Sequence, residues 1–126
     1  MKTFKPSIFG APLLFAVIAS GVPAASAHSF PEAETPSAGQ RLSAPPSEVT
    51  IKFDAPIEKV FAKLEVLGAD GKSETMGQPQ VDSSALTLSV KVDALKPGDY
   101  TVKWGVVCID SHHTEGSYVF TIAGGG

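Results

Sequence analysis

Residues 95–112 read LKPGDYTVKWGVVCIDSH, and this stretch says most about the fold. After the Pro-Gly turn, apolar side chains and a cysteine recur at every second position: Tyr100, Val102, Trp104, Val106 and Cys108. That period predicts a strand with one buried face. Tyr100 stands where the tyrosine hydroxyl of an immunoglobulin-like sandwich hydrogen-bonds back across a corner. A core tyrosine that simply follows a turn is the alternative interpretation.

Outside this stretch, four segments are also predicted as strands: Glu48–Phe53, Ala62–Leu67, Ala85–Val92 and Gly116–Ile122. Asp70-Gly71 predicts a hairpin with a type I′ turn, because both residues tolerate positive φ. The polar segment Glu74–Asp82, which contains Gly77 and Pro79, is predicted as a loop. Short strands joined by turns, with no amphipathic segment of helical length, indicate an all-β fold. We expect a single immunoglobulin-like β-sandwich or barrel.

The N-terminal segment has the pattern of a secretory signal peptide. Lys2 and Lys5 precede the uncharged, mostly apolar stretch 8–18, and Ala25-Ser26-Ala27 places small residues before a cleavage site. An uncleaved membrane anchor is the alternative, but glycines and prolines interrupt the apolar run, and a span takes about 20 predominantly apolar residues. We therefore expect a cleaved signal peptide over residues 1–27 and one domain over residues 28–126.

Composition narrows the function of that domain. Loss of Lys2 and Lys5 moves the formal net charge from −3 to −5. An acidic surface disfavours nucleic acid as a partner and suits a cation. Cys108 is the single cysteine, so no intramolecular disulfide can form, and the apolar core of a domain of this size must suffice. No second hydrophobic span follows, which predicts a protein located in the periplasm or outside the cell.

The histidines stand at suggestive places. His28 would be the first residue after cleavage, so its α-amine and ring Nδ1 could chelate one metal ion; a chance histidine at a processing site is the alternative. Asp110-Ser111-His112 would place a carboxylate and an imidazole on the same side of an extended chain, whereas an exposed polar turn is the plainer interpretation. One amine, two imidazoles and one carboxylate in a tetragonal arrangement favour Cu(II). Nickel and zinc remain alternatives.

Particular residues link the chain from residue 28 to residue 122 to a known family. Besides His28, they are Thr35-Pro36, Gly39, Leu42, Pro46, Val49, Ile51, Phe53, Leu95-x-Pro97-Gly98-x-Tyr100-x-Val102-x-Trp104, and Asp110-x-His112-x-x-x-Gly116-x-x-x-Phe120 with Ile122. With this combination the chain resembles the CopC family of periplasmic copper-resistance and copper-handling proteins. The resemblance implies a Greek-key β-barrel or sandwich of about seven strands. It also implies one Cu(II) per chain, held by the amine and ring of His28 and by Asp110 and His112.

The chain also departs from the family pattern. Members with a Cu(I) site carry a methionine-rich stretch, because thioethers select the reduced ion, but after residue 27 this chain has only Met76. We therefore expect a Cu(II)-only member. His113 follows the proposed ligand where the family commonly has proline, and it is interpreted as a surface residue or an auxiliary ligand. Cys108 is predicted to be a small buried residue, with a Cu(I) thiolate as the alternative.

Three classes of function are compatible with these residues. The first is a copper-binding module without turnover that sequesters Cu(II) or carries it, with a membrane copper transporter as a candidate partner. The second is a histidine-brace copper oxidase or monooxygenase. The third is an immunoglobulin-like interaction domain without metal. An added carboxylate fills a coordination position that an oxidase needs open, so we favour the binding module over an enzyme.

Overall fold

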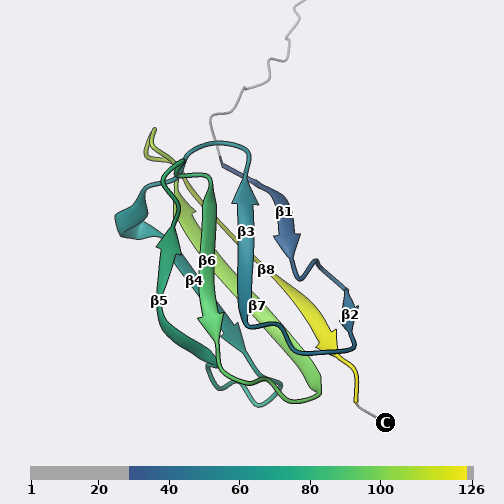
Figure 1. The fold of residues 1–126 in the computed structure, drawn as a ribbon. Helices are drawn as coiled ribbons and strands as arrows, with labels where there is room; N and C mark the ends of the chain where they lie inside the picture. The colour runs from purple at the N-terminus through teal and green to yellow at the C-terminus, as the bar shows by residue number, and fades with distance from the viewer. Residues whose placement is uncertain (1–28, 125–126) are drawn as a thin grey trace, which may run out of the picture.

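Two four-stranded sheets packed on one another make up the computed structural model, which describes residues 29–124 (Figure 1). The first sheet has the order β1 (Pro31–Thr35), β3 (Glu48–Phe53), β6 (Thr87–Val92), β5 (Thr75–Val81). The second has the order β2 (Arg41–Leu42), β8 (His113–Ile122), β7 (Gly98–Val107), β4 (Lys63–Leu67). One turn of 3₁₀ helix, η1 (Lys59–Phe61), precedes β4. The predicted all-β sandwich is confirmed.

The strand count differs slightly from expectation, and one strand runs parallel to its neighbour. Residues 29–124 contain eight strands where about seven were expected, and one of the eight, β2, has only two residues. This short strand pairs with β8 in parallel, whereas the other pairings of the two sheets are antiparallel. The signal peptide predicted for residues 1–27 lies outside the described residues.

The core forms between the two sheets from the residues that alternate in the sequence. Every second residue is buried, as predicted, from Tyr100 in β7 to Cys108 just after its end. The Trp104 ring meets the Phe53 ring edge to face, with centroids 5.3 Å apart, and so joins the two sheets. Tyr100 stacks on Phe120 at 5.6 Å. Burial of these rings and of the aliphatic side chains around them is the main stabilising contribution to the fold.

The predicted tyrosine corner is confirmed. The Tyr100 hydroxyl donates a hydrogen bond of 2.6 Å to the backbone carbonyl of Lys96, across the Pro-Gly turn that opens β7. Tyr100 is 7% exposed, so the bond satisfies a hydroxyl that would otherwise be poorly solvated. The bond fixes the start of the long β7–β8 hairpin at the end of the sandwich remote from the β7–β8 loop (Figure 1).

Two predictions from turn-forming residues were wrong. The segment 74–82 is not a loop, because Thr75–Val81 forms β5, which pairs with β6 at the edge of the first sheet. Gly77 and Pro79 are tolerated there because the edge position and a break in register between Met76 and Gln80 leave their backbone groups outside the ladder. The Asp70-Gly71 turn exists, but only Gly71 has positive φ, so it is not type I′.

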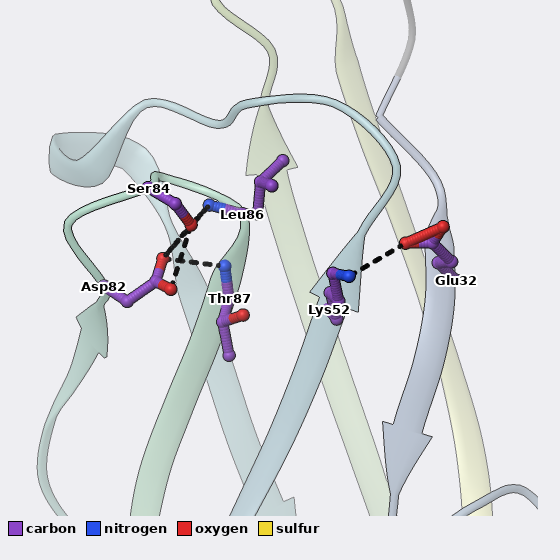
Figure 2. A network of polar contacts seen from close by, with 6 residues as sticks. All are labelled: Glu32, Lys52, Asp82, Ser84, Leu86 and Thr87. Carbon is purple, nitrogen blue, oxygen red and sulfur yellow. Dashed lines mark hydrogen bonds and ion pairs between the residues drawn. The ribbon is translucent and has the colours of Figure 1, made fainter.

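The β5–β6 turn is ordered by one carboxylate. Asp82 accepts hydrogen bonds from the backbone N–H of Thr87 (3.0 Å) and of Leu86 (3.1 Å) and from the Ser84 hydroxyl (Figure 2). The Thr87 bond is the main cause of the lowered pKa of Asp82, and the Ser84 and Leu86 bonds lower it further. Figure 2 also shows the exposed ion pair between Lys52 and Glu32, at 3.6 Å, joining β3 to β1.

A glycine permits the closest approach within the β7–β8 hairpin. Gly116 pairs with Trp104 across the two strands, and a Cβ at residue 116 would lie 2.8 Å from Cζ2 of the indole. Real Cβ atoms do not come this close to a ring atom, so the indole occupies space that any side chain at residue 116 would need. The hairpin can therefore pack its largest side chain directly against backbone.

Candidate metal centre

The candidate site lies in the loop between the two longest strands. β7 ends at Val107 and β8 begins at His113. The Cys108 N–H donates to the His112 carbonyl at 2.7 Å, and the Ser111 N–H donates to the Cys108 carbonyl at 2.8 Å. Ser111 has a φ of 80°, in the left-handed region. The loop is therefore a tight turn, and the extended chain predicted from the Asp-x-His spacing is wrong.

The turn nevertheless brings the two predicted side chains together. Nδ1 of His112 lies 3.0 Å from Oδ2 of Asp110, while the His112 backbone N–H donates to Oδ1 of the same carboxylate at 3.2 Å. The His112 side chain is 59% exposed and that of Asp110 33% exposed. One imidazole and one carboxylate thus lie side by side at the surface, and both are donor types that divalent metal ions accept.

The first described residue lies beside this loop. Ser29 is fully buried, and its backbone N–H donates to Sγ of Cys108 at 2.8 Å. Its carbonyl accepts a bond of 2.9 Å from the Thr114 hydroxyl. Cys108 and Thr114 flank the Asp110–His112 turn on either side, so Ser29 is held at the base of the loop. The proposed ligand His28 lies outside the described residues.

The loop after β3 contacts Ser29 as well. The Ser29 hydroxyl lies 3.0 Å from the Ala55 carbonyl and 3.2 Å from that of Pro56. Phe30 exchanges two bonds with Asp54, one to the carboxylate at 2.9 Å and one between backbone groups at 2.9 Å. Figure 1 shows the start of β1, the end of β3 and the β7–β8 loop at the same end of the sandwich.

The structure also shows the surroundings of Cys108 and His113. Cys108 is 1% exposed, so the predicted burial is confirmed. His113 begins β8 on the outer face of the second sheet, with its side chain 57% exposed and Nε2 3.7 Å from Oε1 of Glu115. It lines a shallow hollow there together with Phe61 and Gly105. Adjacent histidines therefore have different neighbours, which fits the interpretation of His113 as a surface residue.

Sequence reasoning missed Ser29 and Thr114. Neither belongs to a motif, and their contact joins residues 85 positions apart, so no local pattern predicts it.

Within residues 29–124, no group of three or more His, Cys, Asp or Glu side chains could hold a metal ion. The Asp110–His112 pair contributes two of the proposed ligands. No helix in the same part of the chain is long and apolar enough to cross a membrane.

The fold and this loop define a class of protein. It is a small β-sandwich domain that presents a carboxylate–imidazole pair at one end, with the start of β1 tied to the same loop. The family model of the CopC domain matches residues 32–123, which is most of the chain. The chain therefore belongs to the CopC family, as the resemblance of its motifs suggested.

Several known proteins are similar to this chain. Protein YobA of Escherichia coli K12 is 31% identical over 102 residues, covering 79% of this chain and 82% of that protein. The copper transport protein CutJ of Bacillus subtilis is 29% identical over 98 residues, which cover 76% of this chain but 18% of CutJ. The crystal structure of CopC from Methylosinus trichosporium OB3b superposes with a TM-score of 0.73 at 28% identity, covering 79% of this chain and 97% of that one.

A more distant structural relative shares the fold. PcoC, a methionine-rich copper resistance protein from Escherichia coli, matches with a TM-score of 0.66 at 20% identity, covering 75% of this chain and 98% of PcoC. Its methionine-rich character contrasts with this chain, in which Met76 is the single methionine after residue 1. The two proteins therefore differ in the number of soft sulfur donors that they offer.

Proposed function

We propose that this protein binds one Cu(II) ion through the α-amine and ring of His28, the Asp110 carboxylate and the His112 imidazole, and so sequesters or carries copper in copper homeostasis and resistance. Membership of the CopC family and the copper roles in the names of CutJ and PcoC support copper as the ligand. The observation that carries the proposal for the site is the attachment of Ser29 to Cys108 and Thr114 on both sides of the Asp110–His112 turn.

This attachment limits where His28 can be. Consecutive Cα atoms are about 3.8 Å apart, so residue 28 starts from the base of the loop that carries Asp110 and His112. Cleavage after Ala27 would give His28 a free amine next to its ring. Ser29 is already buried and bonded beside the loop, so a ligand at the preceding position would extend from backbone that is fixed there.

The donor set explains both the choice of metal and the absence of turnover in the proposal. Nitrogen and oxygen donors in a tetragonal arrangement suit Cu(II), whereas Cu(I) is favoured by thiolate and thioether ligands. Met76 is half exposed on β5, and Cys108 is buried with its sulfur accepting the Ser29 N–H. Three nitrogens and one carboxylate oxygen would fill four coordination positions, which suits a binding site better than an oxidase, because an oxidase needs one position open.

The cellular setting follows the same reasoning. A signal peptide over residues 1–27 would deliver the protein to the periplasm, and only its removal creates the His28 amine. The region of CutJ that resembles this chain is a small part of a much longer copper transport protein. We take a membrane copper transporter as the partner that delivers or receives the ion.

The decisive experiment compares two forms of the protein. One begins at His28, and the other carries one extra residue before it, which converts the amine into an amide that is no longer a ready donor. With one equivalent of Cu(II), electron paramagnetic resonance of the first form should give a nitrogen-rich tetragonal signal. The extended form should fold normally but bind Cu(II) much more weakly.

The pH dependence provides a second measurement. The ordinary pKa of an α-amino group is about 7.7–8.0, so binding through it should release a proton and weaken as pH falls. Equal affinity of the two forms in calorimetry would remove the terminal amine from the site, and absence of a copper signal would contradict the whole proposal.

A further inference from the structure

Every polar group of Ser29 is hydrogen-bonded, and its partners lie at the end of the sandwich that carries the Asp110–His112 turn. Its N–H donates to Cys108 Sγ at 2.8 Å, its carbonyl accepts from Thr114 Oγ1 at 2.9 Å, and its hydroxyl reaches the carbonyls of Ala55 and Pro56. Ser29 is also the one polar residue among residues 29–124 that is buried, at 0% exposure. Full burial of a serine is tolerated only when its polar groups are satisfied in this way.

The partners of Ser29 are themselves bonded to other parts of the sandwich. The backbone of Cys108 pairs with that of Ile57 in an isolated antiparallel β-bridge. The Ile57 N–H in turn donates to the Ala85 carbonyl of the β5–β6 turn at 2.9 Å. Thr114 pairs with Val106 in the β7–β8 ladder. The groups that hold Ser29 therefore belong to the same framework that carries the Asp110–His112 turn.

We infer that Cys108 and Thr114 are positioning residues for the copper site. Resting on the proposed function, the inference is that the thiol and the threonine hydroxyl fix the backbone of Ser29, which sets where the amine and ring of His28 can reach the metal. We call this arrangement the Ser29 anchor: the Ser29 backbone, Cys108 Sγ and Thr114 Oγ1. The sulfur beside the site then serves as a hydrogen-bond acceptor and not as a ligand.

The reason is preorganisation. A ligand on a freely moving chain end must be ordered when the metal binds, and that cost lowers affinity. A chain end already held beside the other ligands avoids most of it. Groups that orient metal ligands typically contribute about 10–100-fold to metal affinity. We expect the loss of one hydrogen bond of the anchor to lower Cu(II) affinity by an amount at the lower end of that range.

The test uses threonines on one strand. Thr114→Val removes the hydroxyl that binds Ser29 but keeps the shape of the side chain. Thr121→Val makes the same change at the other end of β8, where the hydroxyl bonds Asp99 at 2.7 Å far from the site. Cu(II) affinity, measured by chelator competition, should fall about 10-fold in Thr114→Val. It should stay near wild type in Thr121→Val and in Thr114→Ser, which keeps the hydroxyl.

Repeating the comparison in protein that lacks both proposed donors of residue 28, with His28→Ala and one extra residue before it, separates the inference from the proposed function. If the anchor acts through residue 28, Thr114→Val should have no further effect in that background. A loss of the same size in both backgrounds would overturn the inference, and so would wild-type affinity of Thr114→Val when removal of the two donors itself weakens binding. Wild-type affinity of the protein without the two donors would instead refute the ligands proposed at residue 28, and the anchor's role with them.

A metal-free measurement gives an independent readout. The Ser29 amide should exchange slowly with deuterium in wild-type protein because it is buried and bonded to Cys108. In Thr114→Val it should exchange faster while the Val106 amide is unchanged, and unchanged protection of Ser29 would contradict the anchor. Cys108→Ala removes the thiol acceptor and provides the same tests if Thr114→Val does not fold.

Discussion

Two adjacent histidines offer a matched pair of substitutions. The side chains of His112 and His113 are 59% and 57% exposed, and each lies near an acidic side chain, Asp110 at 3.0 Å and Glu115 at 3.7 Å respectively. An exposed pair of this kind contributes about 0–1 kcal/mol to the free energy of unfolding. For a domain of this size, His112→Ala and His113→Ala should therefore each change Tm by no more than about 4–8 °C.

Copper affinity should separate the two variants. Removing a ligand should cost at least as much as removing a group that orients one, which is about 10–100-fold. That loss corresponds to about 1.4–2.8 kcal/mol of binding free energy, more than the ion pair contributes to folding. We expect it for His112→Ala and not for His113→Ala, because His113 lies on the outer face of β8.

The assay is Cu(II) titration of both variants against a competing chelator, with Tm measured by circular dichroism as the folding control. Asp110→Ala should behave as His112→Ala does. Equal affinities for His112→Ala and wild type, or a greater loss in His113→Ala, would show that the wrong histidine has been assigned to the site. A large fall in Tm in His112→Ala would show that the turn depends on the ion pair for its fold.

Three further predictions concern the sulfur atoms, the hairpin and the β5–β6 turn. Cu(I) should be retained only weakly under reducing conditions, with no difference between wild type and Cys108→Ser; tight Cu(I) retention lost in that variant would make the thiol a ligand. Gly116→Ala should lower the free energy of unfolding by about 1–3 kcal/mol, because the new Cβ would overlap Trp104, and an unchanged Tm would mean that the indole moves aside freely. Asp82→Ala should lower Tm at pH 7. Because hydrogen bonds hold the Asp82 pKa below its usual value of about 3.9, the deficit should shrink as pH falls through that lowered pKa, and a deficit that persists in acid would point to another cause.

The strands were predictable where one face is buried. Alternation around Trp104 places every second side chain from Tyr100 to Cys108 inside the sandwich, and the corner at Tyr100 follows from a local turn. β5 was not predictable in this way, because an edge strand with Gly77 and Pro79 buries little and its pairing with β6 is a tertiary effect.

The candidate site divides similarly into local and non-local parts. Asp110 and His112 could be found because they are close in sequence, although the left-handed Ser111, and not an extended chain, brings them together. The hydrogen bond from Ser29 to Cys108 joins residues 79 positions apart, so no spacing of residues in the sequence predicts it. Propensity and periodicity describe neighbours along the chain, whereas the base of this site is assembled by the packing of the two sheets.

Trp104 has a practical consequence beyond packing. It is the single tryptophan of the chain, and it lies in the core against Phe53 and Gly116. Cys108 follows it by four positions, a path of roughly 14 Å at the usual rise per residue of a strand. Its fluorescence should therefore shift when the core opens to water and dim when a paramagnetic ion occupies the nearby loop. The protein has an intrinsic optical probe for both folding and metal loading, with no attached dye.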